Sequence, residues 1–461
     1  MNSVSGLKRT QSGRRVVVRL LVAPMAAFIA ALLPAIVSAE DLLQIYHDAR
    51  GYDAPYAAAR YALDAGREKL PQGRALVLPT LNLSGNTSYT DLDSNSRNAS
   101  LAPSFERNFR SNSYLISFAQ PLYREQNSLQ YSQSEFQVKQ AEASFGQVGQ
   151  DLIVRVAQSY FDLLAAQDSL AFIRAQKTAI AEQLTQARRN FEVGAATITD
   201  THEAKARFDL SSALELAAQN DLVNKQRALK QITGKEYTGL KPLRAQVKLA
   251  PPNPANMENW VDLARRRSYA VQTQEALIEI ASLEVKRNRA ANYPTLDLVV
   301  THGQTSVTGS TFSSVGTLQT SSAVGLQFAV PLYAGGALLS REREAMANHE
   351  KIKQDLDNAR RLSEFSSGQA YLAVINGIAQ VAALEQALLS SMSALDSTKL
   401  GYKVGVRINI DVLNAQQQLF STERDLALAR YNTIGSQLRL KAAAGALGAD
   451  DLEEVNRALA Q

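Results

Sequence analysis

Residues 189–200 read RNFEVGAATITD, and residues 400–411 read LGYKVGVRINID, so related text occurs twice at an offset of 211 residues. The same offset relates residues 160–234 to residues 371–445 without a gap. A constant offset over so long a stretch is typical of elements whose length is fixed by geometry, because surface loops accumulate insertions. The sequence therefore predicts two structural repeats built from long, continuous elements.

The first 39 residues have the features of a secretory signal peptide. Basic residues precede an apolar run from Leu20 to Val37, and Val37-Ser38-Ala39 forms a small-residue cleavage site. An uncleaved anchor is the alternative, because the run approaches the ~20 residues that span a bilayer. Pro24 and Pro34 inside the run favour cleavage. This segment carries the whole excess charge of +5, so the mature chain is near neutral and its charge does not indicate nucleic-acid binding.

Long helices are predicted in both repeats. Glu125 to about Asn190 contains no proline, and its apolar residues recur three and four positions apart, as in Ile153, Val156 and Tyr160. The second repeat has the same pattern from Tyr371 onward. Such spacing indicates helices packed along a narrow seam, as in coiled coils. A helix of about 65 residues would be roughly 100 Å long, far beyond the average helix of a globular domain.

Four shorter segments alternate apolar and polar residues, at about 78–90, 112–120, 295–304 and 322–330. Each alternates over roughly 9–10 residues, the length of a tilted strand that crosses a membrane. Two soluble hairpins, each with one buried face, are the alternative. Four strands cannot close a membrane barrel, and open edges are not tolerated in hydrocarbon. Strands that enter a bilayer would therefore have to come from several subunits, and three copies would give twelve.

The repeats define the expected domain organisation. The first repeat covers residues 40–240, with its helices reversing at a tip over 191–199. A linker at 241–256 leads to the second repeat at 257–447, whose tip lies at 402–410. Residues 448–461 form a C-terminal tail. Since the chain has no cysteine, no disulfide holds these parts together.

The motifs of the mature chain resemble those of the TolC family of outer-membrane efflux and type I secretion channels. They follow one another in order along the chain: Glu40-Asp41-Leu42-Leu43-Gln44, Leu78-Pro79-Thr80-Leu81, Arg189-Asn190-Phe191-Glu192-Val193-Gly194, Ile198-Thr199-Asp200, Gln231-Ile232-Thr233-Gly234, Tyr293-Pro294-Thr295-Leu296, Val330-Pro331-Leu332-Tyr333 and Gly401-Tyr402-Lys403-Val404-Gly405. The resemblance implies a mainly α fold with a small β part. Three subunits with four strands each would form a 12-stranded β-barrel in the outer membrane, continuous with a coiled-coil helical barrel across the periplasm of a Gram-negative cell.

Glycines mark both tips of the predicted hairpins. Gly194 and Gly405 lie where each long helix reverses, and glycine suits the positive φ of such a turn. A simple helix C-cap explains both glycines. The resemblance additionally implies that these turns contact a periplasmic membrane-fusion adaptor, which connects the channel to an inner-membrane transporter of the ABC or RND type.

Ionisable and polar groups beside the glycines are candidates for a gate. The resemblance implies that Tyr402 and Arg407 of the second tip contact Asp200 and Thr199 of the first tip, and that these contacts hold the tunnel shut. An Arg407–Asp200 pair would be charge-assisted. Arg189 stands where the family prototype has glutamine, so the hydrogen bonds of Tyr402 are expected to differ from those of the prototype.

The resemblance also places a pore constriction on the second tip helix. Two aspartates per subunit line it in the prototype, and the matching positions here are Asp411 and Asn414. Three Asp411 side chains in a trimer are expected to attract cations, though less strongly than six acids would.

No residue pattern supports catalysis, a metal site or a cofactor. The four histidines are scattered without metal-ligand spacing, and there is neither a phosphate-binding glycine loop nor a nucleophile elbow. Three classes of function remain: a passive trimeric conduit set in outer-membrane lipid, a non-membrane periplasmic coiled-coil scaffold, and an enzyme. The sequence favours the conduit, and the resemblance places type I protein secretion ahead of multidrug efflux as its duty. The cargo and the individual partners do not follow from the sequence.

Overall fold

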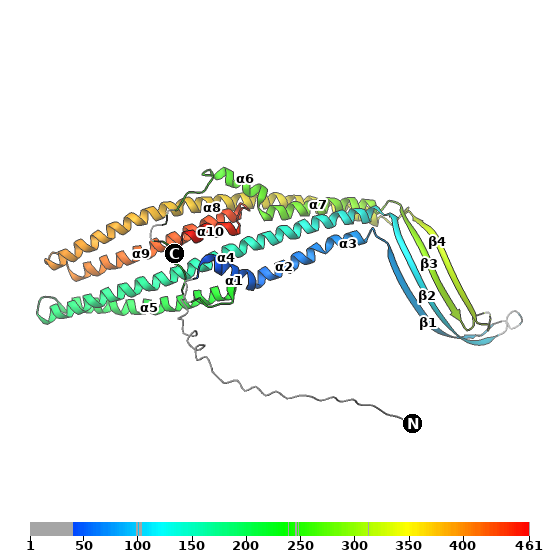
Figure 1. The fold of residues 1–461 in the computed structure, drawn as a ribbon, viewed down its shortest axis with the longest axis horizontal. Helices are drawn as coiled ribbons and strands as arrows, with labels where there is room; N and C mark the ends of the chain where they lie inside the picture. The colour runs from blue at the N-terminus through cyan, green and yellow to red at the C-terminus, as the bar shows by residue number, and fades with distance from the viewer. Residues whose placement is uncertain are drawn as a thin grey trace, which may run out of the picture. The chain divides into compact units, whose positions relative to one another are not determined.

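The computed structural model describes residues 40–97, 100, 104–237, 239–244, 247, 249–311 and 313–460 of the 461-residue chain. The predicted signal peptide lies outside the described residues. Helices make up most of the described chain, and the strands form one sheet (Figure 1). The helices are α1 (Leu42–Tyr52), α2 (Ala54–Arg67), α3 (Lys69–Ala75), α4 (Glu125–Glu192), α5 (Ile198–Thr233), α6 (Met257–Arg267), α7 (Tyr269–Ala290), α8 (Ala337–Lys403), α9 (Asn409–Ala443) and α10 (Ala449–Arg457).

The two repeats share one helical plan. Helix α4 has 68 residues and α8 has 67, so both predicted long helices are present. Toward its C-terminal end α4 is paired with α5, and α8 is paired in the same way with α9 (Figure 1). Near the sheet, α7 packs against both long helices, while α2 and α3 pack against α4. Each long helix therefore changes partner along its length.

The sheet is antiparallel, with the order β1-β2-β3-β4. Its strands are β1 (Thr80–Ser94), β2 (Phe105–Tyr123), β3 (Thr295–Val307) and β4 (Thr317–Ala329). They have 13 to 19 residues, more than the 9–10 expected from alternation, because the pairing continues into the polar segments. Strand β2 also runs through Pro121, at a register shift that accommodates a residue without an N–H group.

The main hydrophobic core lies where the N-terminal helices meet α4. Leu42 and Ile45 of α1 pack in one cluster with Leu152 and Val156 of α4, and all four side chains are fully buried. Tyr160 belongs to the same cluster, and its hydroxyl donates a hydrogen bond of 2.7 Å to the backbone oxygen of a linker lysine. This contact satisfies a polar atom that burial would otherwise leave unpaired. The apolar residues that suggested a helical seam in the sequence are thus core residues.

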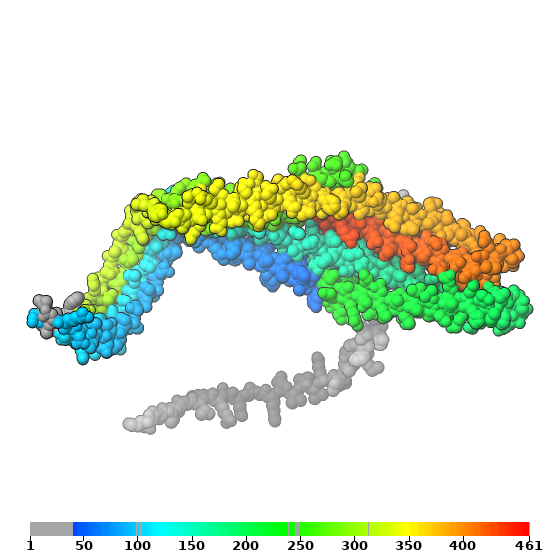
Figure 2. All heavy atoms as spheres, turned by 180° about the vertical axis from the view of Figure 1, so that it is seen from behind, coloured from blue at the N-terminus to red at the C-terminus, as the bar shows by residue number. Residues whose placement is uncertain are grey.

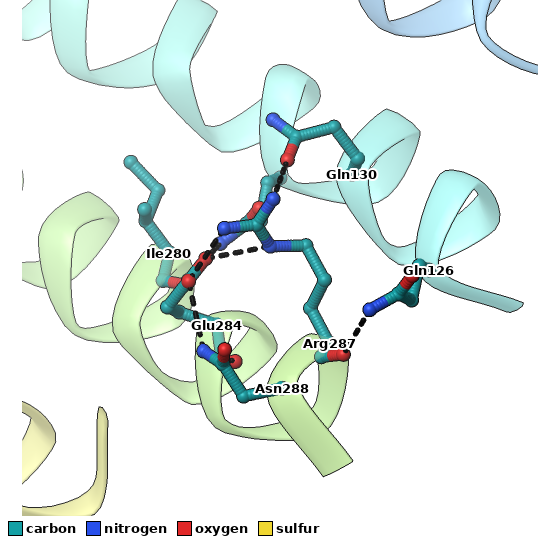
Figure 3. A network of polar contacts seen from close by, with 7 residues as sticks. Gln126, Gln130, Ile280, Glu284, Arg287 and Asn288 are labelled. Atoms are coloured by element: carbon teal, nitrogen blue, oxygen red, sulfur yellow. Dashed lines mark hydrogen bonds and ion pairs between the residues drawn. The ribbon is translucent and has the colours of Figure 1, made fainter. Parts of the chain in front are cut away.

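A polar network joins α4 to α7 (Figure 3). Glu284 accepts hydrogen bonds from Arg287 Nη2 at 2.6 Å and from Gln133 Nε2 at 2.9 Å. Gln133 also donates to the backbone oxygen of Ile280, and Arg287 Nη1 donates to Gln130 at 2.8 Å. Burial tends to raise the pKa of Glu284, but these hydrogen bonds outweigh it and the pKa is lowered. The network fixes the register of α7 on α4 shortly before α7 leads into β3.

The junction between helix and sheet is fixed by a forked ion pair. Arg124, between β2 and α4, donates from Nε and Nη2 to the two carboxylate oxygens of Asp297 on β3, at 2.8 and 2.6 Å. The carboxylate is 8% exposed. Such bidentate pairs add directional specificity as well as energy. The pair therefore sets the direction in which the sheet leaves the helices.

A second forked pair joins α4 to Asp53, the residue between α1 and α2. Asp53 is 4% exposed and accepts from Arg155 of α4 at 3.1 and 2.8 Å, and from the backbone N–H of Tyr56 at 3.0 Å. Burial alone would raise the pKa of Asp53, but the hydrogen bonds from Arg155 and Tyr56 lower it. The pair stabilises the folded state while the carboxylate is ionised. This contribution is present above the unfolded-state pKa and is lost as the pH falls through the lower folded-state pKa.

We expect Asp53→Asn to destabilise the protein by about 2 kcal/mol at neutral pH, because a hydrogen-bonded charge pair at a buried site is broken. The difference from the unchanged protein should shrink in acid, below the ordinary pKa of an aspartate. Thermal or urea unfolding in mild detergent measures both effects. Asp64→Asn on the exposed Asp64–Arg67 pair of α2 is the matched control and should change little. Equal effects of the two substitutions would contradict this account.

Candidate functional site

The two tip turns have nearly the same geometry. Gly194 has φ +75° and Gly405 has φ +81°, so both occupy the left-handed region that favours glycine. Beside them, Val193, Val404 and Val406 are 77%, 66% and 75% exposed. Exposed valines on a turn suit an apolar contact with another protein. The predicted turn positions are therefore correctly located, and their contact with an adaptor stays a prediction.

At the first tip, Asp200 closes a capping box on α5. Its Oδ2 accepts from the backbone N–H and from the hydroxyl of Thr197, both at 3.0 Å, while the Asp200 N–H donates to Thr197 Oγ1 at 3.3 Å. Such reciprocal bonds satisfy the free donors at the start of a helix. Thr199 lies on the same turn and is exposed. Within one subunit, Asp200 therefore stabilises its own helix.

At the second tip, Arg407 lies in the turn before α9, 3.8 Å from the carboxylate of Asp411 in the first turn of that helix. Asp411 also accepts from the backbone N–H of Ile408 at 3.4 Å. The contact expected between Arg407 and Asp200 is absent from the hydrogen bonds and ion pairs of the described single chain. Because Arg407 is beside Asp411 in the subunit, a contact with Asp200 or Thr199 would have to come from another copy of the chain, and the predicted gate stays a prediction.

Tyr402 does join the two tips, but through another partner than predicted. Its hydroxyl accepts a hydrogen bond of 3.1 Å from Asn190 Nδ2 at the end of α4. In the subunit, the hydrogen-bond partner of Tyr402 is therefore Asn190 and not Asp200. The neighbouring Arg189 is exposed, and its backbone oxygen accepts from the N–H of Val193 in the turn. Sequence reasoning missed Asn190, because an asparagine before a helix end also reads as an ordinary capping residue.

A second polar link between the hairpins was also missed. Arg207 of α5 donates from Nη1 to Gln417 Oε1 at 2.6 Å and from Nη2 to Asn414 Oδ1 at 2.9 Å. Asn414 and Gln417 are three residues apart and therefore lie on one face of α9. That spacing is the only signal in the sequence, and it does not reveal the arginine. The predicted constriction position Asn414 is thus held by the first hairpin.

An apolar cluster lies beneath these polar links. Leu184 and Ala187 of α4, Ala204 of α5 and Leu413 of α9 are buried together, with Phe208 of α5 packed against them. Both hairpins contribute to this cluster, so they share one small core near their tips. The tip region consequently has an apolar centre and two cross-hairpin hydrogen-bonded links, at Tyr402 and at Arg207. These few contacts can hold the two hairpins together, and contacts with another protein can replace them.

Comparison with known proteins places the chain among outer-membrane transport proteins. The family model "Outer membrane efflux protein" matches residues 45–235 and 260–446. The outer membrane protein TolC of Vibrio cholerae is 33% identical over 430 residues, which are 93% of this chain and 95% of that protein. The alkaline protease secretion protein AprF of Pseudomonas aeruginosa is 33% identical over 418 residues, 90% of this chain and 86% of that protein. The CmeC outer membrane channel of Campylobacter jejuni has the same fold, with a TM-score of 0.75 and 16% identity over 91% of this chain and 90% of that chain.

Proposed function

The chain belongs to the outer membrane efflux protein family, and we propose that within this family it is the outer-membrane channel of a type I protein secretion system. It is an outer-membrane transport conduit that extends into the periplasm, and it is not an enzyme. The observation that carries the proposed duty is its similarity, over nine-tenths of the chain, to a protein named for the secretion of a protease. Drug efflux is the alternative, which the name of the family itself favours.

We infer that three copies of the chain assemble into the conduit. Strands β1 and β4 are the free edges of the sheet, and every residue of β4 is exposed in the single subunit. Free edges carry unpaired N–H and C=O groups, which cannot be left in hydrocarbon. Pairing β1 of one copy with β4 of the next removes both edges. Three copies then close a ring of twelve antiparallel strands in contact with outer-membrane lipid.

The outer face of α8 supports the same assembly. Within the described residues, α8 is long and apolar enough to count as a candidate membrane span, and only 11% of its most apolar 18-residue window is buried. Figure 2 shows α8, in yellow and orange, open to solvent along much of its length. Its exposed apolar side chains include Leu362, Phe365, Leu372 and Leu389. A neighbouring subunit would cover this face without placing any helix in the membrane.

The tips of the proposed trimer would be the gate and the docking site. Two hairpins from each of three copies bring the links at Tyr402 and Arg207, with the Arg407–Asp411 pair, into one ring around the tunnel end. A membrane-fusion adaptor that contacts the exposed valines of the turns could replace these links by its own contacts. The tunnel would then open toward an inner-membrane transporter, of the ABC type for secretion or the RND type for efflux.

Deletion of the gene should remove one or a few proteins from the culture supernatant and leave the sensitivity to antibiotics unchanged. A secretion channel serves the cargo of its own transporter, so the loss should be nearly complete and narrow. Quantitative proteomics of the supernatant and inhibitory concentrations for a panel of drugs measure the two outcomes, with the complemented strain as control. A drug-sensitive strain with an unchanged supernatant would assign the chain to efflux instead.

A further inference from the structure

We propose that Arg207 is a second closing contact of the tunnel tip, and that its charge offsets the cation preference expected from Asp411. The proposal rests on the proposed channel function. It concerns a residue that none of the motifs in the sequence points to. The observation behind it is the forked contact of one guanidinium with two amide oxygens on the other hairpin, at 2.6 and 2.9 Å.

The contact bridges elements that are otherwise weakly joined. Helix α5 packs mainly against α4, and α9 packs mainly against α8 and α4, so α5 and α9 touch over a short stretch only. Arg207 spans that stretch. A planar guanidinium can donate to two acceptors at once, and such a fork fixes the direction of both partners. Breaking it therefore removes one of the two hydrogen-bonded links between the hairpins and makes it easier for the second hairpin to move away from the first.

Buried amides nearby make this arrangement of the tip easy to disturb. Asn409 and Gln416 of α9 are 2% and 4% exposed. Within the described residues, neither polar atom of the Asn409 side chain has a hydrogen-bond partner, and Gln416 Oε1 has none either. A buried polar group without a partner costs stability. Movement that lets these amides reach water or a neighbouring chain would recover part of that cost, so the observed arrangement depends on links such as that of Arg207.

The charge of Arg207 lies at the predicted constriction. Asn414 is the position at which the resemblance implies a second acid, and here it accepts from a cation instead. Asp411, the remaining acid, already has Arg407 at 3.8 Å. Each subunit therefore brings two guanidinium groups and one carboxylate to this ring. A ring of this composition attracts cations less than the three Asp411 side chains alone would.

Substitution of Arg207 separates the closing role from the charge. Arg207→Gln removes the fork and the charge, so single-channel conductance in planar bilayers should rise severalfold. In a potassium chloride gradient, the reversal potential should shift toward that of potassium. Arg207→Lys keeps the charge but cannot span both amides. It should raise the conductance and leave the reversal potential close to that of the unchanged channel.

The partner position completes the test. Asn414→Ala should raise the conductance without a shift in reversal potential. The double variant with Arg207→Gln should conduct no better than Arg207→Gln alone, because the two substitutions break the same contact. Lys205→Gln is the matched control. It removes one positive charge from the same helix, but Lys205 pairs with Asp209 along α5 and not with the other hairpin. It should behave like the unchanged protein.

The outcomes distinguish this proposal from the function on which it rests. Failure of the unchanged protein to form channels would overturn the proposed conduit. If the unchanged protein, Arg207→Gln and Lys205→Gln all form channels with the same conductance and reversal potential, the role of Arg207 is overturned and the conduit is not. Additive increases from Arg207→Gln and Asn414→Ala would show that they do not act through a shared contact. Far-UV circular dichroism and trimer mobility confirm folding, and Arg207→Lys provides a test if the glutamine variant does not fold.

Discussion

The double variant Arg407→Ser with Tyr402→Phe should conduct severalfold more current than the unchanged channel while its trimer stays intact. Tyr402→Phe removes the acceptor of the Asn190 hydrogen bond that joins the two tips. Arg407→Ser removes the guanidinium beside Asp411 and any contact that it makes with Asp200 or Thr199 of a neighbouring subunit. Each such partly exposed polar contact contributes only about 0.5–3 kcal/mol, so removing two should relax the tip without unfolding the hairpins. Single-channel recording in planar bilayers measures the effect.

Controls for this prediction are available outside the tips. Tyr371→Phe with Arg424→Ser makes the same two chemical changes. Tyr371 donates to a linker carbonyl, and Arg424 pairs with the adjacent Asp425. This control should keep the original conductance, and each single tip variant should give a smaller step than the double variant. An unchanged conductance in the folded double variant would mean that Arg407 and Tyr402 are only solvated tip residues.

The second large effect is expected on assembly. Phe365 and Leu372 are 63% and 51% exposed in the single subunit and lie seven residues apart on one face of α8. Replacing both by glutamate would place two carboxylates per subunit in the proposed interface. Burying an unpaired charge costs several kcal/mol, so the trimer should be lost or should form only at much higher concentration. Size-exclusion chromatography with light scattering in mild detergent reports the change.

Conservative changes at the same positions provide the comparison. Phe365→Leu with Leu372→Met keeps both side chains apolar and should retain the trimer. The glutamate variant should keep its helical circular dichroism, because neither side chain belongs to the core of the subunit. If the glutamate variant still forms trimers as stable as those of the unchanged protein, this face of α8 is not an interface between subunits.

Much of the fold could be predicted because long elements leave periodic patterns. The seam through Ile153, Val156 and Tyr160 predicted α4, and the structure shows all three side chains buried. The repeated glycines located both tip turns, since a reversal with positive φ restricts the residue type. Alternation predicted four strands but underestimated their lengths, because strands continue where backbone pairing persists even after the apolar pattern ends.

The contacts of the tip were harder to predict. Asp200 and Asp411 occupy equivalent positions in the two repeats, and in the subunit both reach back to a backbone N–H at the start of their own helix. A sequence cannot show whether such an aspartate caps its helix or contacts the opposite tip. The contact of Arg207 depends on which faces of α5 and α9 turn toward each other, and that of Asn190 depends on how the ends of α4 and α8 meet. That orientation is set by packing between the hairpins and is not encoded in any short motif.

The mass of the detergent-extracted mature protein tests the central claim most directly. Native mass spectrometry of the protein purified from outer membranes should give three times the mass of one subunit, because only shared strands remove the free edges of β1 and β4. A protein that is uniformly monomeric under the same conditions and still conducts ions in bilayers would contradict the account.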